Sequence, residues 1–275
     1  MQVAYPGSAQ TIMGGLNNSN QIVGTFNPND GHSHGFVRNA DGTYAQVMCP
    51  NAIDTYPHAI NNLGVIAGTC SFGTTAFHGF IRDAVDNFTR VDVPDTSGTS
   101  TSIAGINDSG QVTGSYLDSA GIQHGFLRDA AGSFTLFDVP GAGWTGPRSI
   151  DNSGQITGSY CPETTCNPYR GFVRDTNGAF TTFDLPLGST YNNWKRNTDG
   201  TIVPIAIPTS DTNAFVAFND SGAMIGNDWT TLQGLLAIPC GSATLEVNGR
   251  QHGPGNEIGT VSVVVPAGCS WTAVS

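Results

Sequence analysis

Short stretches of alternating apolar and polar residues, each ended by a turn, follow one another along this chain and predict β-strands. Between residues 101 and 139, four such stretches are rich in β-branched and aromatic residues and are separated by Gly, Asn and Asp. The expected strands are Thr101–Asn107, Gln111–Tyr116, Gln123–Asp129 and Ser133–Val139. Such closely connected strands pair as an antiparallel meander. Helical periodicity is missing and no apolar run is long enough for a membrane-spanning helix, so we expect no membrane insertion.

This pattern of four strands repeats in tandem. Three blocks recur together, and their third copies run from Ile106 to Tyr116, from His124 to Asp129 and from Phe134 to Pro140. The turn residue of the first block falls at Asn20, Gly64, Gly110 and Gly154, in steps of 44, 46 and 44 residues, and a further copy spans Phe218 to Asp228. A unit of four strands and about 45 residues is typical of one blade of a β-propeller.

The two ends of the repeats predict how a ring would close. The opening segment, Met1 to Ser8, resembles the end of a repeat, and the last copy, Ala214 to Pro239, contains three strands and lacks the fourth. We therefore expect the N-terminal strand to complete the last blade, which gives a propeller over residues 1–239 and a short β tail over residues 240–275. The segment Asn197–Ala206 is a degenerate first block without a second half. Five blades with a hairpin insertion are favoured, and six blades are the alternative.

The repeated motifs carry a family resemblance. The blocks Ile-Asn-x-x-Gly, His-Gly-Phe-x-Arg-Asp and Phe-x-x-Asp-Val-Pro-Gly-Ala resemble the bacterial extracellular HAF repeats over most of the chain. The resemblance implies a secreted or surface-exposed, propeller-like protein without a general enzymatic activity. The segment Thr260 to Ser275 resembles the opening strands of a BACON-type β-sandwich domain, whose association with carbohydrate does not transfer to so short a piece.

Composition and charge narrow the class of partner. The chain of 275 residues contains only 11% charged residues, has a formal net charge of -11, and includes 36 Gly. An acidic surface with ten scattered Lys and Arg residues repels nucleic acid, so a nucleic-acid partner is not expected. We expect a bacterial protein at the cell surface or outside the cell. No signal peptide is recognisable, so the sequence would represent the mature or an engineered form.

Six cysteines support an oxidising compartment. The simplest pairing joins Cys49 to Cys70, Cys161 to Cys166, and Cys240 to Cys269, although six cysteines allow 15 connectivities. The alternative is a metal site, but the spacing contains no Cys-x-x-Cys pair with matched histidines. We therefore expect no metal and no cofactor.

Several repeated polar residues invite a functional interpretation, and each has a structural alternative. His34, His78 and His124 occupy equivalent positions on separate blades, too far apart to share a metal, and Arg170 replaces histidine in the fourth copy. A repeated structural hydrogen bond is favoured. A structural role is also favoured for the repeated arginines, which are expected to bond a carboxylate or a turn carbonyl. The Asn-Asp-Ser-Gly turns are interpreted as hairpin turns, because they lack the spacing of a calcium loop. The arginines are Arg38, Arg82, Arg128 and Arg174.

Sequence signatures of catalysis are missing. The chain has no Gly-x-Ser-x-Gly elbow, no His-Glu-x-x-His helix and no phosphate loop, so we expect a protein that is not an enzyme, with a hydrolase as the least favoured class. Aromatic and amide side chains in irregular segments are the candidate ligand-binding residues, because such groups stack on and hydrogen-bond sugars. They are Trp144, Tyr191, Asn193, Trp194 and Trp229. Packing in the core is the structural alternative for the tryptophans.

Two hypotheses of function remain. The first is a structural or adhesive surface protein that assembles into oligomers or filaments through residues 243–275, because two isolated strands are marginally stable and pair readily with a neighbouring sheet edge. The second is a lectin-like propeller module that binds an extracellular glycan. The tail strands could instead pack on their own propeller or belong to a further domain.

Overall fold

The protein is all-β. The structure, a computed structural model, describes residues 2–73, 76–94, 100–162 and 170–184, together with seven short strands farther along the chain. None of these residues forms a helix that is long and apolar enough to cross a bilayer.

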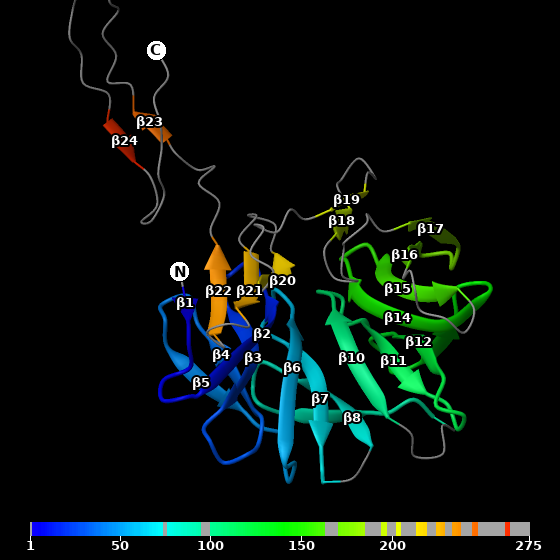
Figure 1. The fold of residues 1–275 in the computed structure, drawn as a ribbon, viewed down its shortest axis with the longest axis horizontal. Coiled ribbons are helices and arrows are strands. Elements are labelled where there is room, and N and C mark those ends of the chain that lie inside the picture. The colour runs from blue at the N-terminus through cyan, green and yellow to red at the C-terminus, as the bar shows by residue number, and fades with distance from the viewer. Residues whose placement is uncertain are drawn as a thin grey trace, which may run out of the picture.

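Four antiparallel sheets of the same build follow one another from Gln10 to Asp184 (Figure 1). Repeat 1 comprises β2 (Gln10–Leu16), β3 (Ile22–Asn27), β4 (His34–Arg38) and β5 (Tyr44–Val47). Repeat 2 comprises β6 (Asp54–Ile60), β7 (Ile66–Ser71), β8 (Phe77–Arg82) and β9 (Phe88–Val91). Repeat 3 comprises β10 (Thr101–Ile106), β11 (Val112–Leu117), β12 (Gln123–Arg128) and β13 (Phe134–Phe137). Repeat 4 comprises β14 (Ala142–Ile150), β15 (Ile156–Pro162), β16 (Arg170–Arg174) and β17 (Phe180–Asp184). The predicted meander is confirmed.

A fifth four-stranded sheet joins the two ends of the repeat region. It has the order β1, β22, β21, β20 and contains β1 (Gln2–Val3), β20 (Asn213–Phe218), β21 (Met224–Asp228) and β22 (Gln233–Ala237). Gln2 lies opposite Leu235 and Val3 opposite Gly234 in an antiparallel pair. The N-terminal strand therefore supplies the fourth strand of the last sheet, as its sequence predicts.

Two further pairs of strands lie outside these sheets. β18 (Trp194–Arg196) pairs with β19 (Ile202–Pro204), in the segment where a hairpin insertion was expected. β23 (Thr244–Glu246) pairs with β24 (Ser262–Val264), within the expected β tail.

Neighbouring sheets pack in the order of the sequence. The first strand of each repeat lies across the preceding sheet: β6 contacts β2, β3 and β4, and β10 contacts β6, β7 and β8. β14 lies in the same way across β10, β11 and β12, and β2 packs against β20, β21 and β22 (Figure 1). Among the described strands, no extensive contact is found between repeat 4 and β20–β22. A closed ring, which the sequence predicted, is therefore not shown.

The apolar core is divided into clusters that lie between successive sheets. In one cluster, Val37 and Val47 of repeat 1 pack with Ile60 and Phe80 of repeat 2. The phenylalanine of the His-Gly-Phe block, and of its Arg-Gly-Phe counterpart in repeat 4, is almost completely buried; these residues are Phe36, Phe80, Phe126 and Phe172. The preceding glycine is required, because a side chain at Gly35 would collide with the carbonyl oxygen of Val47 and with Pro57. This recurring block is thus a packing element of each repeat.

Candidate functional site

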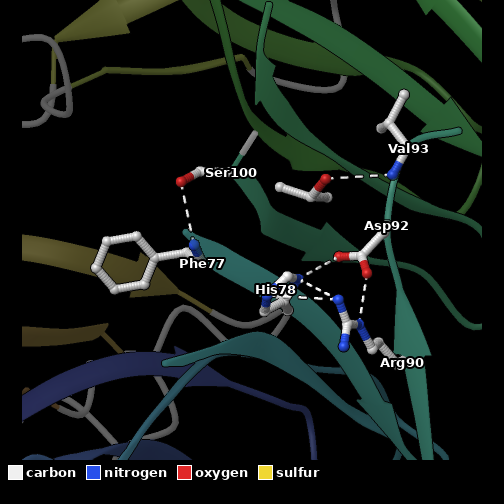
Figure 2. Close-up of polar contacts among 7 residues, drawn as sticks. Phe77, His78, Arg90, Asp92, Val93 and Ser100 are labelled. Atoms are coloured by element: carbon white, nitrogen blue, oxygen red, sulfur yellow. Dashed lines mark hydrogen bonds and ion pairs between the residues drawn. The ribbon is translucent and has the colours of Figure 1, made fainter. Parts of the chain in front are cut away.

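The repeated histidine bonds a carboxylate on the neighbouring strand. His78 is the second residue of β8, and its Nδ1 lies 3.0 Å from Oδ1 of Asp92, directly after β9 (Figure 2). The guanidinium of Arg90 contacts the other oxygen of Asp92, and its Nη2 lies 2.7 Å from Nδ1 of His78. These three side chains link the two outer strands of repeat 2.

The same link recurs in the other repeats with changed residues. In repeat 3, His124 Nδ1 lies 2.8 Å from Oδ2 of Asp138. In repeat 4, Arg170 Nε lies 2.9 Å from Oδ1 of Asp184, so a permanent cation occupies the histidine position. Repeat 1 has no aspartate at this position, and His34 Nε2 instead lies 2.7 Å from Oδ2 of Asp30. The predicted structural hydrogen bond is confirmed for the three histidines, whereas Arg170 makes an ion pair.

Protonation of His124 is coupled to these carboxylates. Burial opposes the charged imidazolium, but hydrogen bonds and charge from Asp138 and Asp118 outweigh it, so the pKa of His124 is raised. His124 Nε2 lies 3.4 Å from Oδ2 of Asp118, which brings a second carboxylate to the ring.

The repeated arginines bond the turns that follow them. Nη1 donates to the carbonyl oxygen of the next residue from Arg38 at 3.3 Å, from Arg128 at 3.3 Å and from Arg174 at 3.5 Å. Arg82 pairs with Asp86 in the equivalent turn. These contacts agree with the predicted structural role of the arginines. They give no support to the alternative, a ring of anion-binding sites.

The Asn-Asp-Ser-Gly turns do more than reverse the chain. Nδ2 of Asn17 donates to the carbonyl oxygen of Asn61, Asn61 donates likewise to Asn107, and Asn107 to Asp151, each at 3.0 Å. These four residues form the asparagine ladder, which crosses from each repeat to the next. Their Oδ1 atoms also accept backbone N–H groups of their own turns, for example from Leu63 and Val65 at Asn61. The sequence predicted the turns and missed the ladder, whose signal is an amide side chain at the same offset in successive repeats.

A second row of bonds runs beside the ladder. The backbone N–H of Asn18 donates to Oδ1 of Asn62, that of Asn62 to Asp108, and that of Asp108 to Asn152. Burial opposes the charge of the Asp108 carboxylate, but hydrogen bonds from Asn62 and Asn152 outweigh burial and lower its pKa. The repeats are thus joined twice at the same end of their first strands.

A hollow of about 370 Å³ lies between repeats 1 and 2 at this end. Its polar lining includes Gln21, Asn39, Asn62 and Arg82, and Leu63, 64% exposed, contributes an apolar surface. We call this the inter-repeat groove. Each amide nitrogen of Gln21, Asn39 and Asn62 donates one hydrogen bond within the protein, and Arg82 pairs with Asp86. The second N–H of each amide suits a ligand rich in oxygen atoms.

The first strand of every repeat contains a β-bulge at the same place. The pairing with the second strand shifts between Met13 and Gly15, Pro57 and Ala59, Ile103 and Gly105, and Pro147 and Ser149. The bulge residues are therefore Gly14, His58, Ala104 and Arg148. Burial, followed by the positive charge of Arg148, lowers the pKa of His58 to about 4. A bulge redirects its side chain, and of these two basic residues Arg148 is exposed and His58 is half-buried.

Of the sequence-predicted ligand residues, the structure describes the side chain of Trp144. Trp144 lies half-buried in β14, where its ring covers Gly146. Trp194 lies in β18, and its side chain is outside the described part of the structure, as are Tyr191, Asn193 and Trp229. In the described residues, no three His, Cys, Asp or Glu side chains are grouped to hold a metal.

One predicted disulfide is confirmed. Cys49, just after β5, bonds Cys70 in β7 with a Cα–Cα distance of 6.4 Å, and so connects repeat 1 to repeat 2. Cys161 is also disulfide-bonded. Cys166, Cys240 and Cys269 lie outside the described residues.

Comparison with known proteins bears on the fold alone. No family model and no curated protein matches the sequence. TolB from Acinetobacter baumannii superposes with a TM-score of 0.54 at 12% identity, covering 83% of this chain and 54% of TolB. A structure from a study of two prolyl endopeptidases gives 0.50 at 12% identity, covering 81% of this chain and 32% of the endopeptidase.

A third neighbour is the β-propeller domain of the Trilobed protease from Pyrococcus furiosus, with a TM-score of 0.39 at 11% identity and coverages of 82% and 95%. The superposition on TolB, with its TM-score of 0.54, supports a β-propeller architecture. This propeller chain spans about half the length of TolB and a third of the endopeptidase, and at these identities their activities do not transfer to it.

Proposed function

We propose that this chain is a non-enzymatic, extracellular structural or adhesive protein built as a five-bladed propeller. Five four-stranded sheets, the place of β1 in the last of them, and the packing of β2 on β20–β22 support five blades. Between repeat 4 and β20, the described strands comprise only the two-stranded pair β18–β19, which favours an insertion over a sixth blade.

The asparagine ladder carries this proposal. Polar side chains that repeat along the chain bond one repeat to the next, and the repeated His and Arg side chains bond carboxylates or turns within their own repeat. Groups held in this way stiffen the molecule and are poorly placed to exchange protons with a substrate. A rigid body is what a building block of a surface layer or filament requires.

Location outside the cell is supported by two features. The Cys49–Cys70 disulfide is typical of proteins in oxidising compartments. The resemblance to HAF repeats implies secretion or surface exposure.

Assembly through residues 243–275 is the further part of the proposal. β23 and β24 pair only with each other in the described structure, and a two-stranded sheet offers two edges for strands of a neighbouring molecule. Addition of a neighbour's strand would join propellers head to tail and could extend into a filament.

The test compares the intact chain with a chain ending at Pro239 and with the variant Val263→Pro, which removes a backbone donor from β24. Negative-stain electron microscopy and light scattering should show ordered oligomers of the intact chain that are lost in both altered chains. Circular dichroism would establish that the sheets persist. Monodisperse monomers of the intact chain at all concentrations would refute assembly.

The inter-repeat groove favours a second function, binding of an extracellular glycan. Leu63 is exposed beside the amides of Gln21 and Asn62, so Leu63→Ala should weaken binding to any saccharide found on a glycan array. Leu136→Ala removes an exposed leucine from the outer strand of repeat 3 and serves as the matched control. Equal binding by the two variants would exclude the groove.

A further inference from the structure

The inter-repeat groove differs in sequence from the equivalent positions of the later repeats. Repeat 1 contributes Asn39 to the lining, where repeats 2 and 3 have Asp83 and Asp129 directly after the third strand. Repeat 2 contributes Leu63, where each of the other repeats has a serine in the first turn. These serines are Ser19, Ser109 and Ser153. The groove thus carries an amide in place of a carboxylate and an apolar side chain in place of a hydroxyl.

The amide side chains of the groove are held in position by the protein. Gln21 Nε2 donates to Asn39 Oδ1 at 3.0 Å, and Asn39 Nδ2 donates to Thr43 Oγ1 at 3.0 Å. Asn62 Nδ2 donates to Asp108 Oδ2 at 2.8 Å. Because an amide has two N–H groups and its oxygen has two lone pairs, each of these side chains keeps a donor and an acceptor site for a ligand. The groove therefore offers donors and acceptors side by side.

The two walls of the groove are fixed relative to each other. The bond from Asn17 to the carbonyl oxygen of Asn61 joins repeats 1 and 2, and the disulfide between Cys49 and Cys70 joins them again. A hollow with fixed walls loses little freedom when a ligand binds. Its volume of about 370 Å³ lies at the small end of the range for ligand sites, about 300–1,000 Å³, and suits a single sugar ring.

The charges around the groove disfavour an acidic ligand. Among the described lining residues, Arg82 is the only ionisable one, and it pairs with Asp86. The carboxylates of Asp83, directly after Arg82, and of Asp108, bonded to Asn62, lie close by. The net charge of the chain is -11. An anionic sugar would meet repulsion here without an unpaired cation to compensate it.

We propose that the inter-repeat groove recognises a neutral acetamido sugar, an N-acetylhexosamine unit of a glycan. The inference rests on the glycan-binding function proposed above for this groove. The methyl group of the acetamido substituent packs on Leu63, which is 64% exposed. The carbonyl oxygen of the substituent accepts from an amide N–H of the groove, and its N–H donates to an amide oxygen. A plain hexose has hydroxyl groups for the amides but no methyl group for Leu63.

The experiment measures binding of chitotriose and cellotriose to the intact chain by isothermal titration calorimetry. The two trisaccharides share one linkage and differ in the acetamido groups, which cellotriose replaces by hydroxyls. Chitotriose should bind about tenfold or more tightly than cellotriose. A hyaluronan tetrasaccharide, in which acetamido sugars alternate with glucuronate, should bind more weakly than chitotriose. Saturation-transfer NMR should show the strongest transfer to the acetyl methyl protons of chitotriose.

Two variants give the groove the residues that other repeats carry. Leu63→Ser removes the apolar surface, and Asn39→Asp removes a donor and adds a negative charge, so each should weaken chitotriose binding about tenfold. Ser109→Ala, at the position in repeat 3 equivalent to Leu63, is the matched control and should leave binding unchanged. Circular dichroism checks that each variant is folded, and the comparison of ligands on the unaltered chain decides the outcome for a variant that is not.

The results separate this inference from the function on which it rests. Equal binding of chitotriose and cellotriose, weakened alike by Leu63→Ser, would overturn the preference for acetamido sugars and leave the groove as a glycan site. Absence of binding by both trisaccharides, or binding that a folded Leu63→Ser variant retains in full, would overturn the inference. Absence of binding to every saccharide of a glycan array would overturn the glycan-binding function as well.

Discussion

At the scale of single residues, one position of the third strand holds histidine in repeat 3 and arginine in repeat 4. His124 pairs with Asp138, and Arg170 pairs with Asp184 at the equivalent place. Because the pKa of His124 is raised in the folded protein, its pairing stabilises the fold fully below the pKa of free histidine and loses this effect as the pH rises through the folded pKa. His124→Gln should therefore lower the free energy of unfolding at pH 5.5, by about 0.2–1 kcal/mol as for exposed ion pairs, and less at pH 8.5.

The matched control is Arg170→Gln, because arginine keeps its charge over this range and its loss should cost the same at both pH values. Urea unfolding of both variants at pH 5.5 and 8.5 gives the comparison. A cost for His124→Gln that did not depend on pH would show that the pairing acts through the neutral imidazole.

At the scale of elements, the asparagine ladder couples turns of adjacent sheets. Asn61 is 4% exposed, donates to Asn107 and accepts two backbone N–H groups of its own turn. Asn61→Asp keeps the acceptor and removes the donor, so it should destabilise the protein by about 1–3 kcal/mol in urea unfolding. Asp151→Asn, the reciprocal change at the exposed end of the ladder, should be close to neutral. Similar costs for the two would contradict a role for the donated bond.

At the scale of the whole molecule, β1 joins the start of the chain to its last sheet. Val3 is 3% exposed and packs with Met13 and Leu16 of repeat 1. Deletion of residues 1–4 should lower the melting temperature in calorimetry on the order of 5 °C, because it removes a buried side chain and leaves β22 as an open edge. Val3→Thr preserves the strand and should cost less. An unchanged melting temperature after deletion would show that β1 contributes nothing to the architecture.

The sequence predicts the repeats well because turn chemistry marks their limits. The expected strand Thr101–Asn107 is found as Thr101–Ile106, and Asn20 takes the left-handed conformation, with φ of 56°, that glycine takes at Gly64 and Gly110. The ladder could not be predicted, since its acceptors lie 44 or 46 residues away and depend on how sheets pack. Alternation of residues also hides a bulge, so His58 and Arg148 cannot be recognised as bulge residues from the sequence.

The ladder joins successive repeats at one end of the sheets, and the bond from the backbone N–H of Ser33 to Asp54 Oδ1 joins repeats 1 and 2 at the opposite end. The connections from second to third strands emerge at the opposite end, where residues 28–33 in repeat 1 and residues 118–122 in repeat 3 differ in both length and sequence. Foreign peptides inserted into these connections would leave the ladder intact. The molecule thus has the properties of a display scaffold, with one end that holds the units in register and an opposite end whose connections vary from repeat to repeat.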